Sequence, residues 1–135
     1  MCMDSSLNKT IELLIERLNP IVVYLFGSAA RNELREDSDI DIAYVSKTRL
    51  TSYENFMLAQ EIADIFKKDV DLVDLKEAST VFKAQVVGTG KNIYCNNENE
   101  RMYFEMRVFK EYALLNEERE SIMLGIKERG SVYGK

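Results

Sequence analysis

The sequence predicts an α+β (α/β) fold, in which helices flank a small mixed β-sheet and a long C-terminal helix follows it. Amphipathic segments with helical spacing alternate with short β-branched and aromatic runs, a pattern typical of such folds. The 135 residues suit one compact domain. We therefore expect a single domain over residues 1–135, with a catalytic part at about 10–100 and a helical segment at about 98–130.

Apolar residues recur at spacings of three and four over residues 10–18, which predicts an amphipathic first helix. Pro20 ends this helix, because the residue before a proline is pushed out of the helical conformation. The apolar positions are Ile11, Leu14, Ile15 and Leu18.

Four short runs rich in β-branched and aromatic residues predict strands. They cover residues 21–26, 40–45, 70–75 and 91–95. Further helices are predicted over residues 29–34, 53–66, 79–87 and 98–128, the last with Asn116 as a position where it could break. The second long helix is expected to bury Phe56, Ala59, Ile62, Ala63 and Phe66 on one face.

Histidine is absent, and this excludes several classes of enzyme. Ser-His-Asp and Cys-His nucleophiles, HExxH zinc sites and histidine acid–base catalysis all require it. Catalysis would have to rely on carboxylates, metals, hydroxyls, lysine or arginine. The net charge of −5 argues against non-specific nucleic-acid binding, which depends on clustered Lys and Arg, so we expect no direct nucleic-acid partner.

Cys2 and Cys95 are the two cysteines, and their spacing fits neither a metal site nor a disulfide framework. Reduced thiols in a cytoplasmic protein are the expected state. The N-terminal residues lack the basic and apolar regions of a signal peptide. No apolar run approaches the ~18 residues that a membrane span needs, so we expect no membrane contact.

Asp39 and Asp41, with one residue between them, lie at the start of a predicted strand. Residues two apart on a strand project from the same face, so these carboxylates point together while Ile40 and Ile42 point the other way. Like charges held so close repel each other unless a cation lies between them. Asp71, inside the next apolar strand, is a third candidate. Because carboxylate oxygens suit magnesium, Asp39, Asp41 and Asp71 are the predicted metal ligands and catalytic residues.

Gly27 and Ser28 form a turn directly after the first predicted strand, where backbone amides and a hydroxyl favour phosphate binding. Asp69 and Asp74 are weaker candidates, because Asp69 lies near the strand start and Asp74 faces the other way. Each motif has a structural alternative: a simple turn, a capping feature or a charge on an edge strand. The order of these motifs along the chain favours a metal and phosphate site over the structural alternatives.

The segment GSAARNELREDSDIDIAY resembles the signature of the nucleotidyltransferase superfamily, which includes DNA polymerase beta, poly(A) polymerases and kanamycin nucleotidyltransferase. With VDLVDL and GKNIYCNN downstream, the chain is most similar to the minimal nucleotidyltransferase (MNT) family, the antitoxins of HEPN–MNT toxin–antitoxin pairs. The resemblance covers about residues 10–100. Asn32 departs from the family pattern, which often has glycine there, but asparagine tolerates a left-handed backbone better than most residues.

This resemblance implies a nucleotidyltransferase fold and the transfer of AMP from ATP to a hydroxyl. Asp39 and Asp41 would hold two Mg²⁺ ions against the triphosphate. Asp71 would bind the catalytic ion and help deprotonate the acceptor, while Gly27 and Ser28 would bind the distal phosphates. The resemblance further implies a HEPN-domain toxin as partner in a hetero-oligomer, with a toxin tyrosine as acceptor.

Two alternatives to this antitoxin enzyme stay open. The protein could neutralise a toxin by binding alone, or it could be a stand-alone transferase for a small molecule such as an aminoglycoside. The C-terminal segment also has two interpretations. We expect Phe104 and Val108 to pack across the sheet, whereas its other aromatic residues could contact a partner.

Overall fold

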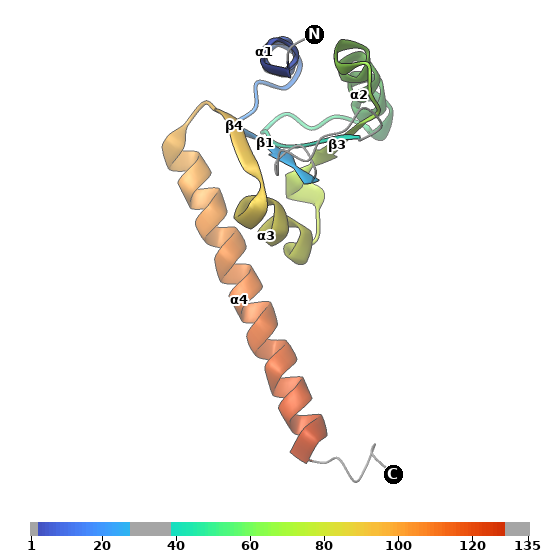
Figure 1. Cartoon of the computed structure of the whole chain (residues 1–135). Coiled ribbons are helices and arrows are strands. Elements are labelled where there is room, and N and C mark those ends of the chain that lie inside the picture. Colours follow the sequence, from blue (N-terminus) through green and yellow to red (C-terminus); the bar gives the residue numbers. More distant parts are fainter. Residues whose placement is uncertain (1–2, 28–38, 129–135) are drawn as a thin grey trace.

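The computed structural model describes residues 3–27 and 39–128, and their side chains over residues 5–27 and 39–120 (Figure 1). The predicted short helix over residues 29–34, Asn32 and Ser28 lie outside these residues. The helices are α1 (Met3–Leu18), α2 (Ser52–Phe66), α3 (Thr80–Thr89) and α4 (Glu98–Glu128), with a short 3₁₀ helix η2 (Leu75–Glu77). The strands are β1 (Val22–Phe26), β2 (Ile40–Val45), β3 (Val70–Asp74) and β4 (Lys91–Cys95).

The strands form one four-stranded sheet in the order β3-β2-β1-β4. β1 pairs antiparallel with both β2 and β4, whereas β2 pairs parallel with β3. The sheet is therefore mixed, as the sequence predicts. The starts of β2 and β3 lie together at one end of the sheet, beside the end of β1, because of this register.

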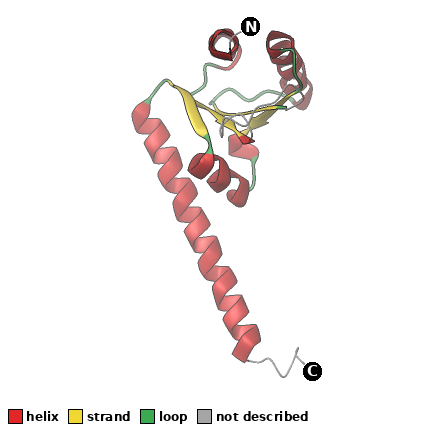
Figure 2. Ribbon diagram, in the orientation of Figure 1, coloured by secondary structure: helices red, strands yellow, loops and turns green. Residues whose placement is uncertain are grey.

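Each face of the sheet is covered by two helices (Figure 2). α1 and α2 cover the face from which Val23, Leu25, Ile40 and Ile42 project, and these residues form one buried cluster with Leu14 and Ile62 among others. α3 and α4 cover the opposite face. The second cluster contains Val22, Tyr24, Ala43, Val45, Leu75 and Val86, with Phe104 packed against it.

The buried face of α2 differs from the predicted one. Ala59 and Ile62 are buried as expected, but Phe56 is 58% exposed. Asn55 takes the inward position one residue earlier, because its side chain has partners there. Its amide donates to the backbone oxygen of Leu72 at 2.8 Å, and its Oδ1 accepts from the Tyr44 hydroxyl at 2.8 Å.

Other elements also differ from the prediction in their ends or their continuity. α1 begins at Met3, because the polar residues Ser6 and Thr10 are buried on its inner side and give no apolar signal. β3 ends at Asp74, whose side chain caps η2 by accepting from the Lys76 amide at 3.1 Å. α4 runs through Asn116 without a break.

α4 is attached to the sheet by its first half and extends well past the other elements (Figure 1). The buried Tyr24 hydroxyl donates to Oε2 of Glu105 at 2.5 Å. Arg101 donates to the other oxygen of Glu105 at 3.0 Å and to Glu98 at 2.6 Å. Phe104 packs against the second buried cluster, which confirms its predicted packing on the sheet, and Val108 is 3% exposed. None of the helices in the described ranges is both long and apolar enough to cross a membrane.

Candidate active site

The predicted carboxylates come from two neighbouring parallel strands. Asp41 on β2 is paired in register with Asp71 on β3, and Phe26 on β1 is the antiparallel partner of Asp41 on the other side. Residues paired in register project from the same face of a sheet. The structure thus places Asp41 and Asp71 side by side at one end of the sheet.

Asp39 lies directly before β2 and is exposed. Ile40 and Ile42 are fully buried against α1 and α2, so Asp41 projects from the other face, together with Ala43. The alternation predicted from the sequence is therefore confirmed for β2. The carboxylate of Asp41 lies on the side of the sheet that α3 and α4 partly cover.

Gly27 closes β1 next to Asp41 and has a φ of 68°, in the left-handed region that favours glycine. A Cβ atom at this position would collide with Oδ2 of Asp41. The lack of a side chain at Gly27 therefore makes room for the carboxylate. The sequence predicts Gly27 as a phosphate-binding residue and does not reveal this contact. The combination of a strand end, a glycine and a DxD motif is the signal from which it could have been inferred.

The charges around Asp41 are not balanced by any cation of the described residues. Burial raises the pKa of the Asp41 carboxyl, and repulsion from Asp71 and then from Asp39 raises it further. Asp71 and Asp39 are therefore both close enough to act on Asp41. No ion pair to any of the three is found within residues 5–27 and 39–120.

This arrangement fits a divalent cation that is held partly by substrate. Within the described residues, no three acidic or cysteine side chains enclose a metal site by themselves. Magnesium does not require such a cage, because it keeps several waters and takes phosphate oxygens of the substrate as ligands. The hard oxygen donors and the unbalanced negative charge at Asp41 are the features that fit this ion.

The two weaker acidic candidates have structural roles or positions apart from the site. The Asp69 backbone oxygen accepts from the Ile40 amide at 2.9 Å, which joins the starts of β2 and β3. Asp74 caps η2 at the far end of β3. An aromatic pair borders the site on the α3 side, since Phe26 and Phe82 meet edge to face with ring centroids 5.4 Å apart. The sequence does not predict Phe82 near the site.

Residues 8–99 match the family described as Polymerase beta, Nucleotidyltransferase. The chain belongs to this family. The mixed sheet, the DxD strand and the acidic neighbouring strand lie inside the matched region, and the fold confirms the expected nucleotidyltransferase architecture.

Similar proteins place the chain among the minimal nucleotidyltransferases of this family. It is 37% identical over 117 residues to the protein adenylyltransferase MntA of Shewanella oneidensis, covering 86% of this chain and 84% of that protein. A crystal structure of a toxin–antitoxin with AMP-PNP matches with a TM-score of 0.79 and 36% identity, covering 88% of this chain and 96% of that one. The MNT antitoxin in complex with tri-AMPylated Shewanella oneidensis HEPN toxin matches with a TM-score of 0.76 and 33% identity, covering 93% and 98%.

Proposed function

We propose that this nucleotidyltransferase is an antitoxin that transfers AMP from ATP to a tyrosine of a HEPN ribonuclease toxin. The observation that carries the proposal is the pairing of Asp41 with Asp71 beside Gly27, on the fold of the family. The likeness to MntA and to antitoxins in complex with AMP-PNP and an AMPylated HEPN toxin supports both the reaction and the partner.

The proposed roles follow from the chemistry of the side chains. Asp39, Asp41 and Asp71 would hold two Mg²⁺ ions, which when bound neutralise charge on the triphosphate. Gly27 and Ser28 would contact the distal phosphates through backbone amides and the hydroxyl. Asp71 would accept the proton of the tyrosine hydroxyl as the tyrosine oxygen bonds to the α-phosphorus of ATP. The bond from that phosphorus to the bridging oxygen breaks, and pyrophosphate leaves.

The acceptor is expected to come from outside the chain. We propose residues 10–100 as the catalytic part of a single domain and residues 98–130 as a helical segment, and the likeness to an antitoxin in complex with a tri-AMPylated HEPN toxin supports an acceptor on a partner. A tyrosine fits as acceptor, because its phenol, with a pKa near 10, is easier to deprotonate than an alcohol. A cytoplasmic setting agrees with the expected reduced state of the cysteines.

Neutralisation by binding alone is the second candidate, and the exposed side chains of α4 favour it. Tyr103 and Phe109 are 59% and 47% exposed. These aromatic side chains are therefore accessible for the predicted contact with a partner. Such a contact would block the toxin without any transfer.

Mass spectrometry separates the two candidates. The HEPN protein expected from the neighbouring gene is incubated with this protein, Mg²⁺ and each nucleoside triphosphate in turn. Transfer adds one or more AMP masses to the toxin with ATP, and Tyr→Phe substitution at the modified position removes the gain. An unchanged toxin mass in every reaction, with the complex intact, would establish binding alone.

A thermal melt tests the metal separately from the partner. Mg²⁺ together with AMP-PNP should raise the melting temperature by more than the sum of the two single additions, because each completes the binding site of the other. Ser28→Ala should weaken this joint effect without abolishing it. Strictly additive shifts would contradict the proposed metal–triphosphate site.

A further inference from the structure

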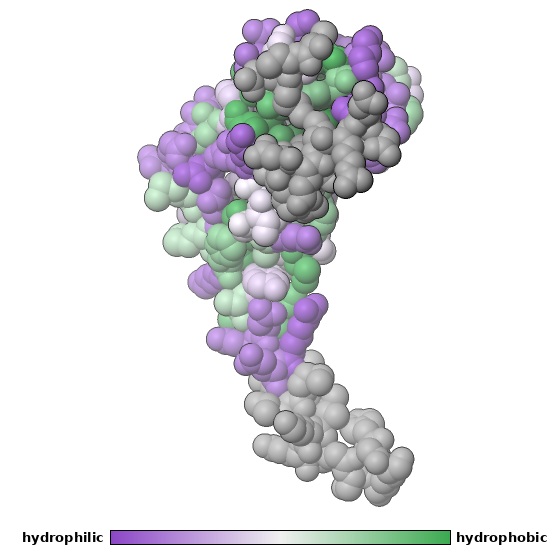
Figure 3. Space-filling model, in the orientation of Figure 1, coloured by the Kyte–Doolittle hydropathy of each residue, from purple (hydrophilic) through white to green (hydrophobic). Residues whose placement is uncertain are grey.

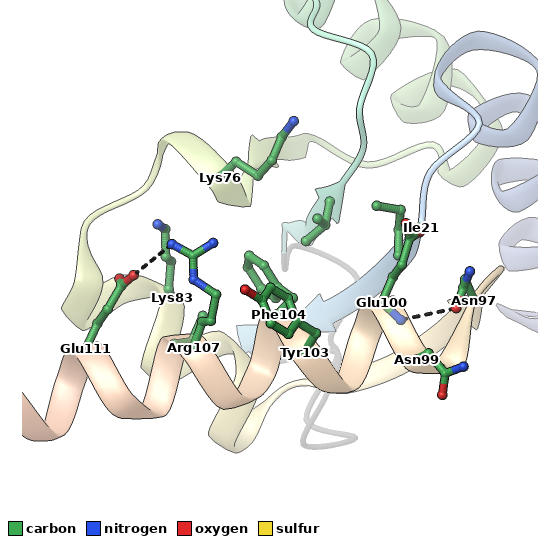
Figure 4. A pocket seen from close by; sticks show the side chains of 12 residues that line it. Ile21, Lys76, Lys83, Asn97, Asn99, Glu100, Tyr103, Phe104, Arg107 and Glu111 are labelled. Atoms are coloured by element: carbon green, nitrogen blue, oxygen red, sulfur yellow. Dashed lines mark hydrogen bonds and ion pairs between the residues drawn. The ribbon is translucent and has the colours of Figure 1, made fainter.

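A hollow lies on the face of the sheet that α3 and α4 cover (Figure 4). It has a volume of about 550 Å³ and is bounded by η2, α3 and α4. Its apolar surface comes from Ile21 directly before β1, from Val45 of β2 and from Phe104 and Val108 of α4. We call this hollow the α4 groove.

Three basic side chains border the α4 groove from three different elements: Lys76 from η2, Lys83 from α3 and Arg107 from α4 (Figure 4). Arg107 is paired with Glu111 at 3.7 Å. Lys76 and Lys83 have no ion-pair partner among the residues that the structure describes. In a chain with a net charge of −5, the groove therefore carries two uncompensated positive charges.

The acidic residues of the α4 groove do not cancel this charge. Glu111 is the partner of Arg107, and Glu100 is paired with Lys47 at 3.3 Å. Both glutamates thus have their own cation, while the two lysines on the opposite side remain available. The groove is complementary to a ligand that carries acidic groups beside an apolar surface.

The apolar surface continues along α4 beyond the groove. Tyr103, Met106 and Leu114 are 59%, 61% and 50% exposed, and with Lys110 they border a second, adjoining hollow of about 440 Å³. Figure 3 shows hydrophobic side chains gathered along the part of α4 nearest the domain and hydrophilic ones over the part beyond it. The combined surface is elongated along the helix, a shape that suits another helix more than a small ligand.

The α4 groove also lies on the face of the sheet from which Asp41 projects. Asp41, Ala43 and Val45 alternate along β2 and project from one face, with Asp41 at the catalytic end and Val45 in the groove. A strand rises about 3.4 Å per residue, so these two positions are roughly 14 Å apart. A protein seated in the groove would thus extend over the catalytic face.

We propose that the α4 groove docks an acidic, amphipathic helix of the partner toxin. This inference rests on the proposed function, because it names the surface that holds the protein whose tyrosine is modified. Apolar residues of the helix would pack on Phe104, Tyr103 and Met106, and Asp or Glu residues beside them would pair with Lys76 and Lys83. Charge complementarity with Lys76 and Lys83 favours an acidic helix, and the proposed function supplies the toxin as the protein that carries it.

Isothermal titration calorimetry of the full chain with the HEPN toxin tests the docking site. The double variant Lys76→Glu/Lys83→Glu should weaken binding at least tenfold, and Met106→Ser should weaken it as well. Phe56→Ser is the matched control, because Phe56 is 58% exposed on α2, away from the groove, and Met106 is 61% exposed. Binding by the wild type should also weaken with added salt more than binding by the double variant. Circular dichroism melts confirm that each variant is folded.

The transfer assay separates failure of this inference from failure of the proposed function. Groove variants should raise the KM for the toxin and leave kcat unchanged, whereas Asp41→Asn should abolish transfer and keep binding. Transfer by the wild type with unchanged binding by all groove variants overturns the inference and leaves the function standing. Loss of binding in the groove variants without any transfer by the wild type supports the docking site and contradicts the proposed transfer reaction. A groove substitution that abolishes self-association in ultracentrifugation, with toxin binding intact, would assign the groove to a second copy and also overturn the inference.

Discussion

Asp41 and Asp71 face each other across the parallel strands β2 and β3, one directly opposite the other in the register. Like charges in directly opposed positions destabilise a sheet. The pKa of Asp41 is raised by burial and by this neighbour, which is the expected sign of that repulsion. The pair therefore costs stability in the absence of a bound cation, and such a cost is typical of residues kept for chemistry.

The first prediction concerns the charge of Asp41. Asp41→Asn should lower AMP transfer by roughly a hundredfold or more, because the proposed metal site would lose a ligand and a bound ion supplies several kcal/mol of charge stabilisation. Its fold should survive, with a stability at pH 7 equal to or above that of the wild type. The raised pKa means that the folded state prefers the protonated acid, so wild-type stability falls as the pH rises through that pKa. The gain of the variant should therefore vanish in acid, where the wild-type carboxyl is protonated.

Urea titrations at several pH values measure this difference, with Asp64→Asn on the exposed side of α2 as the control. Asp39→Asn should behave in the same way with a smaller effect on stability, because Asp39 is the least of the three causes that raise the pKa of Asp41. An Asp41→Asn chain that is unfolded at pH 7 would show that the carboxylate is structural.

The second prediction concerns the space next to Asp41. Gly27→Ala should destabilise the protein by about 1–2 kcal/mol, because an alanine at φ 68° is strained. The new methyl group would also push against Oδ2 of Asp41, so transfer should fall tenfold or more in the protein that remains folded. Gly88→Ala is the control, since no atom lies within 4 Å of a Cβ at Gly88 in α3. That change should stabilise the helix by up to about 1 kcal/mol and leave transfer unchanged. Equal activities of the two variants would argue against the contact.

Much of this site could be predicted from the sequence because its signals are local. Alternation of Asp41 with Ile40 and Ile42 fixes which side chains share a face, and this needs only the geometry of one strand. The strands containing Asp41 and Asp71 were visible as apolar runs interrupted by acids. The order of elements is compatible with pairing of these two strands as direct neighbours. No single segment of the sequence specifies that pairing.

Other features depend on contacts between distant segments and leave no local signal. The inner face of α2 is set by the two hydrogen bonds of Asn55, so a polar residue displaces Phe56 from the expected position. Lys76, Lys83 and Arg107 lie near one another only after α4 packs on α3. Three separate basic residues in an acidic chain do not indicate a binding surface by themselves.

The third prediction concerns alkaline stability. Burial raises the pKa of Tyr44 to about 12, and repulsion from Asp74 contributes. In the unfolded chain a tyrosine ionises near pH 10, so stability from this residue is complete below about pH 10 and is lost as the pH rises toward 12. Tyr44→Phe should flatten the stability profile over this window. It should also cost about 1 kcal/mol at pH 7, because the bond from the hydroxyl to Asn55 is lost. Parallel profiles for the two proteins between pH 10 and 12 would contradict the prediction.

The fourth prediction concerns the attachment of α4. Tyr24→Phe removes the hydrogen bond between the buried hydroxyl and the carboxylate of Glu105, and should lower stability by about 1.5–3 kcal/mol. Because this bond joins β1 to α4, amide hydrogen exchange should increase most in residues 98–108. Arg107→Ala is the comparison on the same helix, where the exposed pair with Glu111 should contribute less than about 1 kcal/mol. Uniform exchange along the whole chain would show that Tyr24 supports the core without holding α4 in particular.

The last prediction separates catalysis from binding inside the cell. Asp71→Asn should still bind the toxin, because Asp71 lies at the catalytic end of the sheet, whereas the proposed docking surface lies along α4. It should fail to modify the toxin, since the acid that would accept the phenolic proton is gone. Asp74→Asn is the control on the same strand, because Asp74 caps η2 at the far end of β3 and transfer should continue. Each variant is co-expressed with the toxin, and growth is compared with the mass of the recovered toxin. If Asp71→Asn cells grow as well as wild-type cells, and the toxin recovered from both has an unchanged mass, masking by binding is the mechanism. That result would end the transferase proposal.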